Sequence, residues 1–170
     1  MKPTLTKKIG LLLLLPFIGS LGGTLVFSAY LDRTRNAEHV VNAAGRQRLL
    51  AAELSDWTRM VSLGQDDDRA GLESRILEFD QVLAVLQHGG RVLDATVDAL
   101  APELRPELAP IAALWGELRP DLWTVATAWR TDVRFATASQ QVERGLPRLR
   151  AASALFVAAF AARRERQQEE

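Results

Sequence analysis

The stretch "VVNAAGRQRLLAAEL", residues 40–54, predicts an α-helix, because it is built mainly from Ala, Leu and Val and contains no proline. It places Arg46 and Arg48 two positions apart, directly after Gly45. Two positions on a helix are about 200° apart around the axis, so the two guanidinium groups cannot point the same way. If one arginine faces water, the other faces a second helix or a partner.

The neighbouring positions indicate which arginine points inward and which one faces solvent. Two adjacent stripes are small or apolar except at Gln47 and Arg48; they are Val41, Gly45, Arg48 and Ala52, and Val40, Ala44, Gln47, Ala51 and Leu54. We therefore expect Arg48 to point inward, toward the bundle or a partner subunit, and Arg46 to face solvent. Gly45 would let another helix approach closely. The candidate ligand-binding residues are Arg48, Gly45, Gln47 and Asn42, with Arg46 disfavoured.

A half-buried guanidinium group at Arg48 needs a counter-charge. A carboxylate within the bundle would supply it, and so would a bound anion gripped by the two-pronged arginine fork. Spacing alone leaves both interpretations open. The two stripes together form a wider apolar surface than packing against one neighbouring helix of the same subunit requires. This predicts a homodimer with Ala44 and Ala51 at the subunit contact.

Three more amphipathic helices are predicted downstream, because apolar residues recur at steps of three and four. These residues are Leu72, Ile76, Phe79, Leu83 and Leu86; then Ile111, Trp115, Leu118, Leu122, Val125 and Trp129; then Val142, Leu146, Leu149, Ser153, Phe156 and Phe160. We expect the second helix to close at His88–Gly90, level with residues 42–48. The third should span about 108–131 and the fourth should start near 132. Residues 91–107, which include Pro102 and Pro106, should form a connector.

The N-terminus carries a membrane signal. Residues 9–31 have no charge and are long enough to cross a hydrocarbon core about 30 Å thick. Three lysines precede them, so the positive-inside rule keeps residues 1–8 in the cytoplasm and sends residues 32–170 outward. A cleaved signal peptide is the alternative. The expected location is a membrane, with a single span and the bundle on its outer side; the resemblance given below implies a bacterial inner membrane and the periplasm.

The predicted fold class is all-α: an N-terminal transmembrane helix that continues, over about 31–63, into an antiparallel up-down-up-down four-helix bundle. The fourth helix returns toward the membrane, where a second span would be expected. We therefore expect the chain to be the front part of a longer receptor, with a natural single-span protein as the alternative.

Composition excludes several classes of function. The formal net charge is zero, which gives no electrostatic reason to expect a nucleic-acid partner. The sequence has no cysteine, and its two histidines, His39 and His88, lie far apart, so no metal site or other cofactor is predicted. Residues 66–68 are three aspartates that favour a helix N-cap over a calcium loop. No convergent acid, base or nucleophile is visible, so we predict no catalytic residues and no enzyme.

The motif "NAAGRQR" at 42–48 resembles the signature of the N-terminal sensor domain of type IV pilus methyl-accepting chemotaxis transducers. The same domain type forms the periplasmic sensor of nitrate/nitrite-responsive histidine kinases. The resemblance continues through "LEFDQVLAVLQHGG", "IAALWGELRPDL" and "LPRLRAASALFVAAFAARRER", and covers roughly residues 9–170.

This resemblance implies a dimeric, membrane-anchored four-helix sensor that signals through its first and last helices. In the nitrate sensors, the arginine three residues after the signature glycine binds the anion at the dimer interface, and Arg48 occupies that position here. Ala43 stands where those sensors have a lysine, so a small anion or another small ligand is expected rather than nitrate itself. The alternative function is a membrane-tethered helical bundle that binds a protein partner, such as a pilus or solute-binding component, without a small ligand.

Overall fold

The computed structural model describes residues 27, 38–64, 68–92 and 94–169. The chain divides into two units, residues 1–38 and residues 39–170, and the helical bundle belongs to the second unit. The predicted membrane span at 9–31 lies outside the described residues except for position 27. The expected continuation of this span into the first helix therefore stays a prediction.

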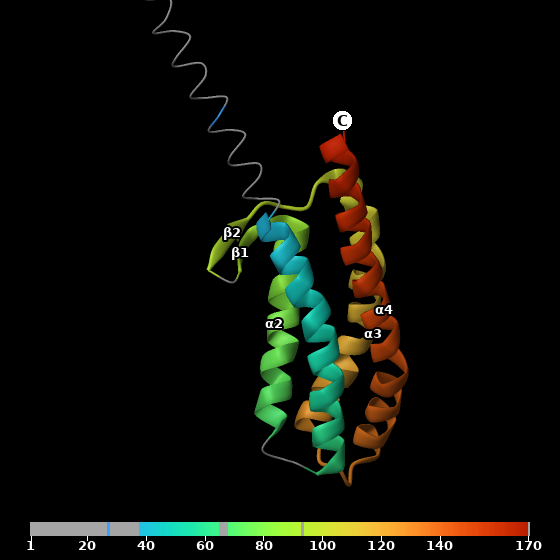
Figure 1. The fold of residues 1–170 in the computed structure, drawn as a ribbon. Helices are drawn as coiled ribbons and strands as arrows, with labels where there is room; N and C mark the ends of the chain where they lie inside the picture. The colour runs from blue at the N-terminus through green and yellow to red at the C-terminus, as the bar shows by residue number, and fades with distance from the viewer. Residues whose placement is uncertain (1–26, 28–37, 65–67, 93, 170) are drawn as a thin grey trace, which may run out of the picture. The chain divides into compact units, whose positions relative to one another are not determined.

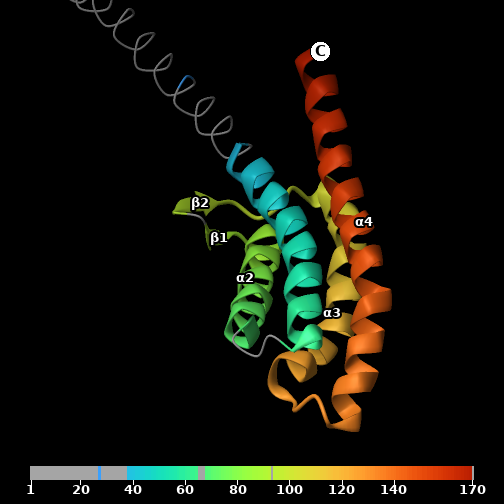
Figure 2. The same cartoon turned by 60° about the horizontal axis from the view of Figure 1, so that its bottom comes forward.

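The second unit is a bundle of four helices, which confirms the all-α class. They are the helix at residues 38–63, α2 (Arg69–His88), α3 (Arg105–Thr127) and α4 (Val133–Glu169). Successive helices run in opposite directions, with the 38–63 helix beside α2 and α3 beside α4 (Figures 1 and 2). The 38–63 helix ends, and α2 begins, at the end of this unit where residues 128–132 connect α3 to α4 (Figure 1).

The predicted apolar stripes of the last three helices lie in the core, except for Trp129 and for Phe160, which is only partly buried. All five stripe residues of α2 are buried, as are those of α3 up to Val125 and those of α4 up to Phe156. The ring of Trp115 stacks on Phe79 with a centroid distance of 4.1 Å, and its indole nitrogen donates to Asp80 Oδ1 at 2.6 Å. Trp129, which continues the stripe in sequence, is 81% exposed, so its assignment to the core was wrong.

Trp129 lies outside the core because α3 ends two residues before it. Ala128 is extended, with φ −78° and ψ 151°. The guanidinium group of Arg69 donates to the carbonyl oxygens of Val125, Ala126 and Ala128 at 3.2, 3.0 and 2.8 Å. Carbonyl groups in the last turn of a helix have no partner within it, so this arginine of α2 stabilises the end of α3.

Local sequence explains the other helix ends only in part. Asp68 occupies the N-cap position of α2, but its side chain makes no capping hydrogen bond, so that part of the prediction was wrong. Gly89 ends α2 with a φ of 76°, a conformation that favours glycine, and its N–H donates to Val85 O at 2.8 Å. Asp132 precedes α4 and accepts a hydrogen bond from the Arg134 N–H at 2.8 Å.

The connector is more ordered than expected. Strands β1 (Gly90–Val92) and β2 (Ala95–Val97) form an antiparallel hairpin, and a 3-10 turn, η2, spans Pro102–Leu104. Val92, Val97 and Leu100 bury their side chains against the bundle. The sequence did not predict this hairpin, because strands of three residues are too short to show an alternating pattern. The two prolines therefore suggested only a connector over residues 91–107.

One helix among the described residues, Val133–Arg163 within α4, is long and apolar enough to cross a membrane by length and composition. A core helix of a water-soluble bundle passes the same test. Here Val142, Leu149 and Phe156 lie in the core of the bundle. We therefore interpret α4 as a bundle helix.

Candidate functional site

Arg46 lies in an ion-pair network, which corrects the expectation that it faces solvent. Its Nε and Nη2 atoms donate to Glu78 Oε1 and Oε2 of α2 at 2.6 and 2.7 Å, in bidentate geometry. Its Nη1 atom reaches Glu53 Oε1 at 3.0 Å. Arg75 completes the network, with its Nε 2.7 Å from Glu53 Oε2 and its Nη1 3.0 Å from Glu78 Oε2. Only 19% of the Arg46 side chain is exposed, so its charge is satisfied within the protein.

The network changes the pKa values of Arg46 and Glu78, the pair at its centre. The hydrogen bonds from Arg46, followed by its positive charge, hold the pKa of the Glu78 carboxyl below its ordinary value, against the opposing effect of burial. The same contacts raise the pKa of Arg46. Both residues therefore stay charged near neutral pH, and the pair connects the 38–63 helix to α2.

Arg48 lies on the other side of its helix and is exposed. It makes no ion pair or hydrogen bond with any described residue, so the interpretation in which an internal carboxylate neutralises it is wrong for this part of the chain. Of the two directions expected for Arg48, the one into the bundle was also wrong, and the one toward a partner subunit stays a prediction. The error arose because spacing shows that two arginines diverge, but not which of them meets α2.

A surface pocket of about 530 Å³ lies beside Arg48, between the 38–63 helix and α4. Arg150 of α4 lines it too, and likewise has no ion-pair partner among the described residues. The other lining residues are Leu49, Ala52, Pro147, Ala151 and Ala154. The pocket thus has two unneutralised guanidinium groups, small apolar walls and no carboxylate among its described lining residues. Arg150 did not emerge from the sequence, because it is one of several arginines on a mostly exposed helix.

The remaining predicted site residues do not all share this pocket. Gln47 is fully buried, and neither of its amide atoms has a hydrogen-bond partner in the described part of the chain. Asn42 is exposed, one and a half turns before Arg48 on the same helix. No atom lies within 4 Å of where a Cβ on Gly45 would stand. The described chain therefore does not make the close helix approach expected at this glycine.

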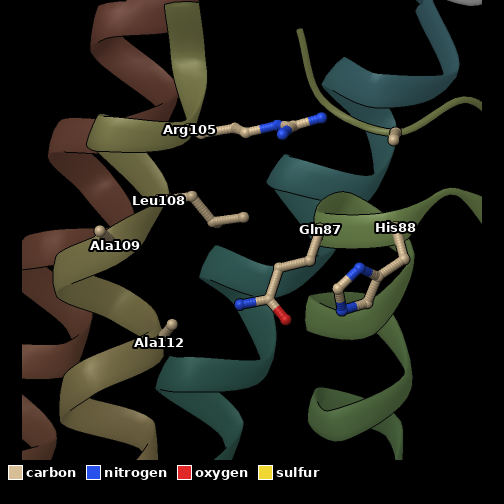
Figure 3. A pocket seen from close by; sticks show the side chains of 7 residues that line it. Gln87, His88, Arg105, Leu108, Ala109 and Ala112 are labelled. Carbon is tan, nitrogen blue, oxygen red and sulfur yellow. The ribbon is translucent and has the colours of Figure 1, made fainter. Parts of the chain in front are cut away.

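The motif at residues 42–48 does not lie level with the end of α2, as the sequence had predicted. Arg46 lies opposite Glu78, and His88 is ten residues further along α2, which corresponds to about 15 Å of helix. The end of α2 therefore lies well beyond the motif. A second pocket opens there, lined by Gln87 and His88 from α2, Ala99 from the connector, and residues from the start of α3 (Figure 3).

No carboxylate is among the described residues that line either pocket. In the portion of the chain that the structure describes, no group of three or more His, Asp or Glu residues could hold a metal ion. The surface at the motif offers fixed cations and small apolar contacts, which suit recognition of a ligand. The described bundle is therefore a helical domain with a cationic surface pocket beside the motif.

Comparison with known protein families identifies the class to which this helical domain belongs. The family model of the type IV pili methyl-accepting chemotaxis transducer N-terminal domain (PilJ) matches residues 30–145. The chain belongs to this family, and the described bundle is a sensor domain of the chemotaxis-transducer type. A search of curated proteins found no match.

A solved structure supports the same assignment. The chain is similar to the ligand-binding domain of the P. aeruginosa nitrate receptor McpN, with 26% sequence identity and a TM-score of 0.51. The match covers 73% of this chain and 94% of that domain.

Proposed function

We propose that this chain is the extracytoplasmic sensor domain of a membrane-anchored bacterial receptor, and that it detects a small anion at Arg48. The observation that carries the proposal is the pair Arg48 and Arg150, two unneutralised guanidinium groups that line one pocket beside the family motif. Planar guanidinium forks bind oxyanions in bidentate fashion. The nitrate receptor named by the structural match detects a ligand of this chemical class.

The proposed site includes a second subunit. The pocket is open to solvent, and Leu49 and Leu155 expose 51% and 71% of their surface on the two helices that flank it. A second copy of the chain would cover these apolar side chains and lower the local dielectric, which strengthens an arginine–anion contact. Gly45 and Asn42 would then lie near the subunit contact. Gln47, which is buried inside the bundle, would not touch the ligand.

The remaining elements of the proposal concern topology. Residues 9–31 would anchor the domain in the inner membrane, with residues 1–8 in the cytoplasm and residues 32–170 in the periplasm. The 38–63 helix and α4 would carry the signal, because both flank the anion pocket.

The test is thermal unfolding of the full chain in detergent, with sodium nitrate, nitrite, sulfate or phosphate added at constant ionic strength. An anion present at about one hundred times its dissociation constant should add about 2.7 kcal/mol of stability. Arg48→Ala and Arg150→Ala should each remove most of this gain. Arg48→Lys should also bind weakly, because a point charge does not reproduce a fork.

Two variants provide matched controls. Arg59→Ala on the 38–63 helix and Arg144→Ala on α4 each remove an exposed arginine that has no partner among the described residues, and both should keep the full stabilisation. If the unmodified chain ignores all four anions, the proposal fails and the protein-partner function takes its place.

A further inference from the structure

The pocket at the end of α2 shares no residue with the anion pocket at Arg48. It has a volume of about 620 Å³ and is lined by Gln87, His88, Ala99, Arg105, Leu108, Ala109 and Ala112. In Figure 3, Arg105 extends from the start of α3 toward the connector, and Gln87 and His88 come from the end of α2 on the opposite side. Leu108, Ala109 and Ala112 follow one another along α3. Polar groups from two elements therefore line the pocket together with an apolar wall.

The chain fixes the shape of this pocket through backbone contacts. A Cβ on Gly89 would stand only 2.8 Å from the backbone nitrogen of Ala99, so the close approach requires glycine at this position. The Leu100 N–H donates to Leu86 O at 3.0 Å, and the Leu100 side chain is buried. These contacts hold the connector against the last turn of α2. The pocket wall is thus part of the packed fold.

Arg105 is held in position without being neutralised. Its Nε atom donates to Leu100 O at 3.3 Å, and no described residue forms an ion pair with it. The two terminal nitrogens are left to bind a ligand end-on, the geometry that suits a carboxylate. No described residue that lines the pocket is acidic. The side chains of Gln87 and His88 have no partner among the described residues, so they can hydrogen-bond a ligand as well.

We propose that this pocket is a second ligand site, specific for a small organic carboxylate with an apolar body. The carboxylate binds the terminal nitrogens of Arg105, and the apolar body lies on Leu108 and Ala112. A cation beside an apolar wall favours such a ligand over inorganic anions, which gain nothing from the wall, and over neutral ligands, which gain no charge-assisted hydrogen bond from the exposed guanidinium group.

The site lies where occupancy would act on α4. Glu103, two residues before Arg105, accepts a hydrogen bond through its carbonyl oxygen from Arg163 Nη1 of α4 at 3.4 Å. A ligand on Arg105 therefore contacts a segment that is itself bonded to the C-terminal part of α4. This gives the second ligand a physical route to the helix that also borders the anion pocket.

The experiment is isothermal titration of the full chain in detergent with sodium benzoate, with benzyl alcohol as the neutral probe of similar shape. Benzoate should bind at least tenfold more tightly than benzyl alcohol. Arg105→Ala should weaken benzoate binding at least tenfold and leave benzyl alcohol almost unchanged. Ala112→Phe fills the pocket without altering charge and should weaken both probes.

Two controls separate this site from other arginines. Arg91→Ala removes an exposed arginine of β1 that does not line the pocket, and should leave benzoate binding intact. Arg48→Ala should also leave benzoate binding intact, so the experiment tests the two proposed sites separately. The proposal is overturned if the unmodified chain does not bind benzoate at 10 mM, a concentration about tenfold above a typical weak Kd of 1 mM. It is also overturned if a folded Arg105→Ala variant, checked by circular dichroism, binds benzoate as well as the unmodified chain.

Discussion

At the scale of single residues, Arg46 and Arg48 have opposite environments although they are two positions apart. Arg46 is neutralised by Glu78 and Glu53, whereas Arg48 has no described partner. A cation whose charge is already satisfied has little to offer an anion, and an unneutralised cation retains its full electrostatic attraction. The structure of the network thus favours Arg48 for ligand recognition and gives Arg46 a role in stability.

Glu78→Gln tests the stability role. The folded-state pKa of Glu78 lies below the ordinary value of 4.5, so the pair stabilises the fold above that value and loses its effect as pH falls through the folded pKa. At about pH 7 and low salt the variant should lose about 1 kcal/mol, a modest amount because water screens a partly exposed pair. Chemical denaturation should show a smaller loss at an acidic pH below that ordinary value than at pH 7.

The matched control is Glu73→Gln, which changes a carboxylate of the same helix that has no ion-pair partner among the described residues. It should cost little at either pH. Equal losses for both variants would contradict a specific role for the Arg46–Glu78 pair.

At the scale of elements, helix contacts depend on where glycine allows close approach. A Cβ on Gly145 of α4 would overlap the side chain of Leu118, which is buried in α3. Gly116 of α3 has open space, with no atom within 4 Å. Both glycines lie inside helices, so their intrinsic helix propensity is the same and only their packing differs.

Gly145→Ala should therefore destabilise the chain by about 1–2 kcal/mol, because the overlap with Leu118 outweighs the gain in helix propensity. Gly116→Ala should stabilise it by about 0.5–1 kcal/mol. Thermal or denaturant unfolding measures both changes. A stabilising effect at Gly145 would mean that α3 and α4 can separate without cost.

The sequence predicted these elements well where a long periodic pattern exists. The stripes of α2, α3 and α4 are buried as expected, apart from Trp129, which is exposed, and Phe160, which is only partly buried. The periodicity continues through Trp129, but the helix does not, because Arg69 from another helix bonds the carbonyl groups near its end. A local pattern contains no information on such a distant contact.

At the scale of the whole molecule, the structure relocates the expected subunit contact. Ala44 and Ala51, predicted at the dimer contact, are 2% and 0% exposed in the core of the described bundle, so that prediction was wrong. The stripe that contains them packs inside one subunit. The proposed dimer contact therefore moves to the exposed face that carries Leu49 and the Arg48 pocket.

A single cysteine tests this surface cleanly, because the chain has none of its own. Leu49→Cys should form a disulfide-linked dimer in membranes under mild oxidation. Leu77→Cys, similarly exposed but on α2, should stay monomeric, as should buried Ala51→Cys. Cross-linking at position 77 without any at position 49 would place the subunit contact on another face. Electrophoresis without reducing agent gives the result.

The sequence by itself determined the four helices, most of the apolar faces of α2, α3 and α4, and the family motif, because a period of 3.6 residues is a local property of the chain. Only the tertiary structure decided which arginine of the motif is neutralised, and that Arg150 joins Arg48. Those outcomes depend on how each helix is rotated and shifted against neighbours about 30 or 100 residues away. Rotation by one residue turns a side chain through about 100°, enough to move it from an ion pair into a ligand pocket.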